Sequence, residues 1–263
     1  MVLIFDMDGV LVKSTFFADI LVKMICQRFE DYNIEMERQK VFQEILRRFV
    51  NKLNEEDKTP AYDWDLIVGE YLSEYKLPWA CEIEDVFNSD IITEYSTLYR
   101  DVTVNLDWLL EKGFKLALLT NGLGKYQNNI IEKLGIQRYF QKIMMPDPEK
   151  IKFVKPHPEI FKEVVEGFPE PYVMIGDSLY FDVYGAKKIG FETIWLARGL
   201  PKRYRALPIL DRTAEINQKE KYLLRNILRG ASFVNMLPEE IEIEEFKPDK
   251  IICNLNELRD LFS

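Results

Sequence analysis

The sequence predicts an α/β fold in which a doubly wound parallel sheet carries an inserted, all-helical module. The first observation is that short apolar runs, each ending in polar or glycine residues, alternate with amphipathic segments, as in parallel strands joined by helices. The second is that residues 14–99 interrupt this alternation with several amphipathic runs and no convincing strand. We therefore expect an α/β core domain formed by residues 1–13 and 100–263, and a helical domain formed by residues 14–99.

Six short apolar runs are expected to form the core sheet. In chain order they are residues 2–5, 115–119, 142–145, 172–175, 193–196 and 251–253. Runs of this length are typical of strands that are buried on both faces. The segments between and after them are predicted to be helices, at residues 105–112, 126–134, 158–166, 181–189 and 255–262.

The helical domain is expected to hold amphipathic segments, because apolar residues recur there at helical spacing. These segments are residues 16–29, 36–53, 62–75 and 83–98. A second interruption, residues 199–246, is polar and mixed, with a predicted helix at 215–229 and an acidic run at 238–245. We interpret residues 199–246 as a surface insertion before the last strand.

Composition excludes several classes of protein. The 263 residues include 35 basic and 44 acidic side chains, a net charge of −9, which argues against general nucleic-acid binding. An apolar run of the ~20 residues that a membrane span needs is missing, and Asp6 falls too early for a signal peptide. Three widely spaced cysteines indicate free thiols in a reducing compartment. We expect a cytoplasmic protein that binds no membrane; its oligomeric state is left open.

The first group of candidate site residues follows the first strand. In Asp6-Met7-Asp8-Gly9, two carboxylates one residue apart face one small site and repel each other. A bound Mg²⁺ would remove that penalty, because it prefers hard oxygen ligands. Gly9 permits the tight loop that such a site needs. By itself, the tetrapeptide is equally compatible with an ordinary turn at the end of a strand.

Three further groups follow later elements. Thr120-Asn121-Gly122 offers a hydroxyl and backbone N–H groups after the second strand, which suits an anion. Lys155 precedes two prolines in a stiff loop that could hold its ammonium toward a site. Asp177 and Asp182 bracket the start of a helix after the fourth strand. Because the carboxyl ends of parallel strands meet at one edge of a sheet, we expect these groups to lie together.

In this order, the segments DMDGV, LLTNG, KPHPEIF and GDSLYFDVYGAKKIG resemble the four motifs of the haloacid dehalogenase (HAD) superfamily. The resemblance covers residues 1–13 and 100–199, together with a similar ending at residues 247–262. It implies a Rossmannoid core, and the helical domain is similar to the family's C1-type cap. Residues 9–13 occupy the place of the flap at the cap hinge.

The resemblance also implies a role for each candidate residue. Asp6 matches the nucleophile that forms an aspartyl-phosphate, and Asp8 matches the acid that protonates the leaving oxygen and then activates water. Thr120 and the Asn121 backbone match the phosphate cradle. The remaining matches are Lys155, which neutralises Asp6 and phosphate; Asp177, which binds Mg²⁺ with Asp6 and the backbone oxygen of Asp8; and Asp182, which orients Lys155 or a water on the metal.

Three positions depart from the family pattern. Lys13 stands where Asp is common in the flap, and Phe181 stands where Asn is common. His157 replaces a frequent Asp, and we expect it to have a structural role. The aromatic residues Tyr62, Trp64 and Tyr71 could line a pocket, although their helical spacing favours packing between cap and core.

The implied function is a Mg²⁺-dependent phosphatase that hydrolyses a small phosphorylated metabolite through an aspartyl-phosphate. A phosphomutase or phosphotransferase on the same core is the alternative. A 2-haloacid dehalogenase is disfavoured because it would not need Asp8. A non-catalytic binding module is disfavoured because Asp6, Asp8, Lys155 and Asp177 are all present.

Overall fold

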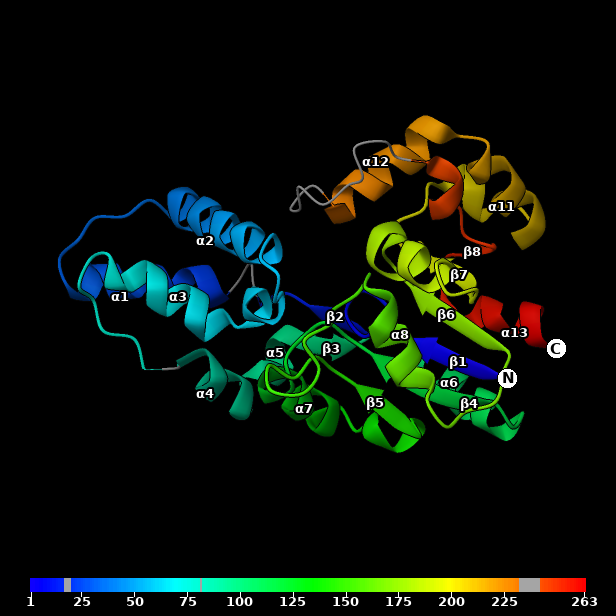
Figure 1. The fold of residues 1–263 in the computed structure, drawn as a ribbon, viewed down its shortest axis with the longest axis horizontal. Helices are drawn as coiled ribbons and strands as arrows, with labels where there is room; N and C mark the ends of the chain where they lie inside the picture. The colour runs from blue at the N-terminus through cyan, green and yellow to red at the C-terminus, as the bar shows by residue number, and fades with distance from the viewer. Residues whose placement is uncertain (17–19, 81, 232–241) are drawn as a thin grey trace.

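The structure is a computed structural model, and it describes residues 1–16, 20–80, 82–231 and 242–263 (Figure 1). Its centre is a six-stranded sheet with the order β5-β4-β1-β6-β7-β8, in which every neighbouring pair is parallel. The strands are β1 (Val2–Phe5), β4 (Lys115–Leu119), β5 (Lys142–Met144), β6 (Tyr172–Gly176), β7 (Glu192–Leu196) and β8 (Lys250–Ile252). The predicted fold class is therefore confirmed, and all six strands lie where the apolar runs indicated.

The sheet is covered by helices on both faces. Alternate residues of one strand enter opposite clusters: Leu3 and Phe5 pack in one, Val2 and Ile4 in the other. The first cluster includes side chains from α6 (Val102–Glu111), α7 (Gly124–Lys133) and α13 (Leu258–Phe262). The second includes side chains from α8 (Pro158–Val165) and α9 (Gly185–Lys187). Burial on both faces explains why the strands read as unbroken apolar runs.

Residues 14–99 form the helical part of the chain, which Figure 1 shows at the end of the molecule opposite the C-terminus. Its helices are α1 (Val22–Asp31), α2 (Arg38–Leu53), η2 (Thr59–Tyr62), α3 (Trp64–Ser73), α4 (Glu82–Asn88) and α5 (Ile92–Tyr95). The predicted segment 16–29 is described only from residue 20 on, apart from Phe16, because residues 17–19 lie outside the described ranges.

Two short strands, β2 (Val12–Ser14) and β3 (Ser96–Leu98), form an antiparallel pair where the chain leaves and re-enters the core. The prediction of a continuous helical segment over 83–98 without strands was wrong here. β3 owes its conformation to hydrogen bonds with β2, and the two strands are far apart in the sequence, so local periodicity cannot indicate the pairing.

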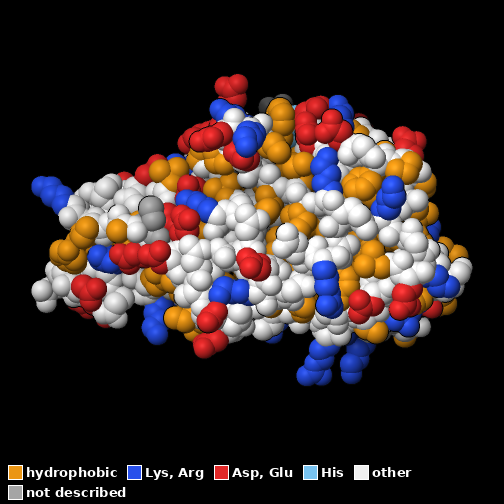
Figure 2. All heavy atoms as spheres, turned by 90° about the horizontal axis from the view of Figure 1, so that it is seen from below, with side chains coloured by type: hydrophobic (Ala, Val, Ile, Leu, Met, Phe, Trp, Pro, Cys, Tyr) orange, Lys and Arg blue, Asp and Glu red, His pale blue; other side chains and the backbone are white. Residues whose placement is uncertain are grey.

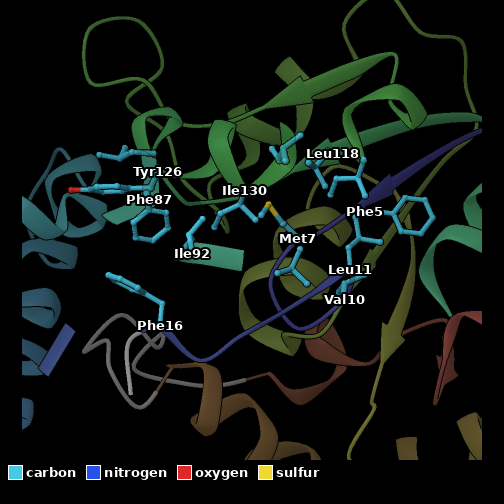
Figure 3. Close-up of a cluster of buried hydrophobic side chains, with 14 of the residues drawn as sticks. Phe5, Met7, Val10, Leu11, Phe16, Phe87, Ile92, Leu118, Tyr126 and Ile130 are labelled. Carbon is cyan, nitrogen blue, oxygen red and sulfur yellow. The ribbon is translucent and has the colours of Figure 1, made fainter. Parts of the chain in front are cut away.

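The helical part rests on the core through a continuous apolar cluster (Figure 3). Phe16 packs edge-on against Phe87 of α4, with ring centroids 4.5 Å apart, and Phe87 lies 5.1 Å from Tyr126 of α7. Figure 3 shows these rings continuing through Ile130 to Met7 and Phe5 at the first strand. The two parts of the chain are thus joined by packing as well as by the β2–β3 pair.

Residues 199–246 contain α10 (Lys202–Arg205), α11 (Ile209–Asn217), α12 (Glu220–Ala231) and η5 (Ile243–Phe246). The prediction of a single helix at 215–229 was wrong, because α11 ends at Asn217 and a separate helix, α12, begins at Glu220. The break lets Ile216 of α11 and Leu223 of α12 bury their side chains in one cluster with Phe246. Of the predicted acidic run 238–245, residues 238–241 lie outside the described ranges.

Charged side chains of both signs are mixed on the surface. On the face that Figure 2 shows, Lys and Arg side chains are interspersed with Asp and Glu. Among the described residues, no helix is both long enough and apolar enough to cross a membrane.

Candidate active site

The predicted site residues meet at the carboxyl end of the sheet. Asp6 follows β1, Thr120 follows the neighbouring β4, and Asp177 follows β6 on the other side of β1. They open onto one cavity of about 640 Å³. All eight predicted residues line it: Asp6, Asp8, Gly9, Thr120, Asn121, Lys155, Asp177 and Asp182. The expectation that these groups lie together, drawn from the way neighbouring parallel strands end at one edge of a sheet, agrees with the structure.

A buried ammonium lies between two carboxylates in this cavity. Lys155 Nζ is 2.6 Å from Asp6 Oδ1 and 2.7 Å from Asp182 Oδ1. The side chains of Lys155 and Asp182 are 3% and 0% exposed, so solvent screens these ion pairs very little. Asp182 also accepts a hydrogen bond from the Ser178 backbone N–H at 3.0 Å through its other oxygen. Both oxygens of Asp182 are thus engaged, and the residue holds Lys155 in position.

The Asn121 side chain fixes the loop that carries Lys155. Its Oδ1 accepts a hydrogen bond from the Lys155 backbone N–H at 2.7 Å, and its Nδ2 donates to the Lys155 carbonyl at 3.1 Å. The same Nδ2 donates to the hydroxyl of Tyr62, which belongs to the helical part, at 2.8 Å. The sequence pointed only to the Asn121 backbone, because nothing local to residue 121 indicates a partner at residue 155.

Gly9 and Asp177 are in close contact. Gly9 has a φ of +80°, and a Cβ built on it would lie 2.1 Å from Asp177 Oδ2. Only glycine adopts this backbone without strain while leaving room for the carboxylate. The backbone of Asp177 is also held, because Trp195 Nε1 donates a hydrogen bond to its carbonyl oxygen at 2.8 Å.

Three carboxylates are close enough together to hold a cation. Oxygen atoms of Asp6, Asp177 and Asp182 lie within 4.8 Å of one another. This donor set consists of hard oxygens, which suits Mg²⁺ better than a soft metal. The Asp8 side chain is not in this group.

The electrostatics of the site favour a bound cation. Burial raises the pKa of Asp6 to about 7, although Lys155 acts against that rise. Asp177 lines the cavity, yet the surrounding protein removes water from its carboxylate. This desolvation, together with the charge of Asp6, raises the pKa of Asp177 well above the ordinary value. Burial by itself lowers the pKa of Lys155, but Asp182 and Asp6 outweigh burial and raise it. Ionising these neighbouring carboxyl groups therefore has an electrostatic cost, which a bound positive charge would reduce.

Asp8 has a partner that the sequence did not suggest. Gln127, in the first turns of α7, donates from Nε2 to Asp8 Oδ2 at 3.2 Å. Burial raises the pKa of Asp8, and the hydrogen bond from Gln127 acts in the opposite direction. Burial therefore favours the protonated form of Asp8, and Gln127 favours the carboxylate while it fixes the orientation of the group.

Arg198 is a second residue that the sequence did not suggest. Its guanidinium donates to the backbone carbonyls of Gly9 and Val10, at 3.2 and 2.6 Å, and lies 3.8 Å from the Tyr99 ring centroid. It also pairs with Asp101 at 2.9 Å. One side chain from the end of β7 thus contacts both chain segments that connect the core to the helical part.

The remaining positions singled out in the sequence are placed as follows. Lys13 is exposed on β2, away from the residues that line the cavity. His157 has a structural role, as expected: its Nδ1 accepts from the Glu159 N–H at 3.2 Å and caps α8. Tyr62 and Trp64 line the cavity, whereas Tyr71 is buried elsewhere. The packing that the helical spacing favoured holds for all three, and Tyr62 and Trp64 in addition line the cavity, the other possibility that the sequence left open.

Comparison with known proteins gives matches over most of the chain. The sequence model of the haloacid dehalogenase-like hydrolases matches residues 1–190. The glyceraldehyde 3-phosphate phosphatase of Pyrococcus furiosus is 27% identical over 201 residues, which are 75% of this chain and 81% of that protein. The phosphoserine phosphatase of Thermus thermophilus is 32% identical over 106 residues, which are 39% of this chain and 42% of that protein.

Solved structures agree in fold. A HAD phosphatase from Thermococcus onnurineus is similar with a TM-score of 0.67 at 21% identity, covering 100% of this chain and 97% of that one. The L-2-haloacid dehalogenase of Xanthobacter autotrophicus is similar with a TM-score of 0.57 at 19% identity, covering 99% of this chain and 97% of that one. At such identities the similarity concerns the fold alone. The family match, which spans well over half of the sequence and all four motifs, shows that this chain belongs to the haloacid dehalogenase-like hydrolases.

Proposed function

We propose that the protein is a Mg²⁺-dependent phosphatase that hydrolyses a small phosphomonoester through an aspartyl-phosphate on Asp6. The observation that carries this proposal is the buried Lys155 ammonium, 2.6 Å from Asp6 in a cavity that Asp8 and Asp177 also line. Relatives named as phosphatases of glyceraldehyde 3-phosphate and phosphoserine support a small phosphorylated substrate. A cytoplasmic location remains part of the proposal.

The proposed metal ligands are the carboxylates of Asp6 and Asp177 and the backbone oxygen of Asp8. Asp6 and Asp177 fit this role because their oxygens converge, because their pKa values are raised in the absence of a cation, and because Gly9 leaves space beside Asp177. When bound, the cation offsets the negative charge of the phosphoryl group and of the carboxylates around it.

The phosphoryl group would be bound by residues that follow β4 and by Lys155 in the loop before α8. The Thr120 hydroxyl accepts a hydrogen bond from the Gly122 N–H at 3.2 Å and keeps its own proton to donate to a phosphate oxygen. The Asn121 side chain is already engaged, so its backbone N–H is the group that remains for phosphate. Lys155 adds a positive charge that a transferring phosphoryl group needs.

In the first half-reaction, an oxygen of Asp6 attacks phosphorus and the bond from phosphorus to the ester oxygen breaks. Asp8 in its protonated form, which burial favours by raising its pKa, gives its proton to the departing alkoxide, which leaves as an alcohol. The phosphoryl group is then an acyl phosphate on Asp6. Dividing hydrolysis in this way replaces one difficult step by two easier ones.

In the second half-reaction, Asp8 is a carboxylate and accepts a proton from a water molecule. That water attacks phosphorus, the bond to Asp6 breaks, and inorganic phosphate leaves with Asp6 restored and Asp8 again protonated. Gln127 donates to Asp8 from the side and keeps its carboxyl group in one orientation for both steps.

We also propose that residues 14–99 act as a cap on the core formed by residues 1–13 and 100–263. Support comes from the β2–β3 pair, through which the chain leaves and re-enters the core, and from cap residues that line the cavity. Closure of such a cap would exclude water from the first half-reaction.

The proposed function is tested by release of p-nitrophenol from p-nitrophenyl phosphate, with and without Mg²⁺. We expect turnover that requires Mg²⁺ and is lost in Asp6→Asn. Because p-nitrophenolate leaves without needing an acid, Asp8→Asn should release one equivalent of p-nitrophenol per enzyme in a burst and then stall. Turnover by Asp6→Asn at the wild-type rate would contradict the proposed nucleophile.

A further inference from the structure

Part of the cavity lining is aromatic. We define the aromatic wall as Phe49, Tyr62, Trp64 and Phe181, all of which line the cavity. The first three come from the proposed cap, and Phe181 comes from the turn of π-helix Leu179–Tyr184 beside Asp182. The substrate's organic part would meet these side chains, because the phosphoryl group occupies the polar end.

Packing fixes the rings of the aromatic wall. Phe49 and Trp64 are stacked, with centroids 5.5 Å apart and 18° between their planes, and Phe49 meets Tyr62 edge-on at 5.6 Å. Phe181 packs with Phe49 and Tyr62 around the buried Leu53 and Ala61. The rings are therefore held in place before any ligand binds, which lowers the entropic cost of binding.

The aromatic wall does more than join cap to core. All four residues are half-buried and line the cavity, whereas residues that serve only in the core, such as Leu53 and Ala61 behind them, are fully buried. Tyr62 is further tied to the polar end, because its hydroxyl accepts a hydrogen bond from Asn121 Nδ2 at 2.8 Å. That hydroxyl keeps its own proton, which it can donate to a bound group.

The charge of the cavity is strongly one-sided. Among the described residues that line it, Lys155 is the one cation, against the carboxylates of Asp6, Asp8, Asp177 and Asp182. Lys155 is engaged by Asp6 and Asp182. The other described side chains around the aromatic wall, such as Asn226 from α12, are neutral. A second anionic group on the substrate would be desolvated there without a second positive side chain among the described lining residues.

Resting on the proposed function, we propose that the aromatic wall selects phosphomonoesters whose organic part is a planar, uncharged ring, and that the cavity discriminates against a second negative charge. Flat rings match the offset and edge-to-face arrangements that aromatic side chains favour. The departure at Phe181 fits this assignment, since an apolar ring there completes the wall next to the catalytic carboxylates.

The experiment compares kcat/KM for two matched pairs of substrates at saturating Mg²⁺. Benzyl and cyclohexylmethyl phosphate differ in planarity, and propyl and 2-carboxyethyl phosphate differ in one negative charge. We expect benzyl phosphate to exceed cyclohexylmethyl phosphate by about tenfold. We expect 2-carboxyethyl phosphate to fall below propyl phosphate by about a hundredfold.

Two variants locate the effect. Trp64→Leu should reduce the benzyl-to-cyclohexylmethyl ratio to about 2 or less. Phe42→Leu, which alters an exposed ring on α2 outside the cavity lining, should leave the ratio unchanged. Far-UV circular dichroism and thermal melting check that both variants fold; if Trp64→Leu does not, Phe181→Leu takes its place.

The outcomes separate the two proposals. A benzyl-to-cyclohexylmethyl ratio near 1, or a 2-carboxyethyl ester hydrolysed as fast as its propyl partner, would overturn the proposed selectivity while Asp6-dependent turnover remained intact. Loss of the ratio in Trp64→Leu but not in Phe42→Leu would support it. If no ester, p-nitrophenyl phosphate included, were hydrolysed in an Asp6-dependent way, the proposed function itself would fail.

Discussion

The contact between Gly9 and Asp177 makes the substitution Gly9→Ala informative about the metal site. An alanine at this position has two separate costs. The first is a φ of +80°, which an L-residue adopts at a cost of about 1–2 kcal/mol. The second is steric: the new Cβ would lie 2.1 Å from Asp177 Oδ2, whereas such contacts essentially never fall below 3.0 Å.

The second cost determines the effect on metal binding. The Asp177 carboxylate has to withdraw by about 0.9 Å, the difference between those two distances. Distances from ligand to metal tolerate changes of only about 0.2 Å. We therefore expect Gly9→Ala to weaken Mg²⁺ binding by about tenfold or more, equivalent to about 1.4 kcal/mol, and to reduce kcat at limiting Mg²⁺.

Gly113→Ala is the matched control. Gly113 has a φ of +83°, but a Cβ there would meet nothing within 4 Å. Urea unfolding should show a comparable loss of backbone stability in both variants, and titration calorimetry should show weakened Mg²⁺ binding in Gly9→Ala alone. Equal Mg²⁺ affinity in the two variants would refute the idea that Gly9 makes room for a metal-binding Asp177.

Three other predictions follow from buried polar groups. Burial raises the pKa of Asp6 from 3.8 to about 7. Between pH 4 and 7 the folded state therefore keeps a proton on Asp6 that the unfolded state has lost. With divalent metal chelated, the free energy of unfolding should therefore decrease as pH rises from 4 to 7, and urea titrations should show a flatter profile in Asp6→Asn; identical profiles would contradict this. Gln127→Leu removes a bond that lowers the pKa of Asp8, so the alkaline limb of the kcat/KM profile should move to higher pH, with no movement counting against the assignment. Arg212 is 2% exposed and pairs with Glu257 at 2.6 Å. The substitution Arg212→Met should therefore lower the free energy of unfolding by about 3–5 kcal/mol, measured by chemical denaturation. The control Arg225→Met alters an exposed side chain and should change that free energy little.

Features that depend on local pattern were predictable from the sequence. The run Val2–Phe5 is apolar because β1 is buried on both faces, and the same reasoning located the other five strands. The convergence of Asp6, Thr120 and Asp177 followed from a topological rule, since residues after neighbouring parallel strands meet at one edge.

Features that depend on distant partners were not predictable. β3 forms because β2 offers hydrogen bonds from the far end of the inserted segment, and a single helix at 215–229 fails because Ile216 and Leu223 enter one cluster. Gln127 and Arg198 look like ordinary polar residues in the sequence. Their roles arise only where the fold brings them to Asp8 and to the Gly9 carbonyl.

The central position of β1 has a consequence for how the chain is made. Residues 2–5 are synthesised well before their neighbours in the sheet, which are β4 at Lys115–Leu119 and β6 at Tyr172–Gly176. At about 5–20 residues per second, the ribosome needs roughly 10–30 s to reach the end of β6. Until β6 has been made, the apolar segment Val2–Phe5 lacks at least one of the two strands that flank it in the sheet. The central strand of the sheet can therefore complete its pairing only late in synthesis.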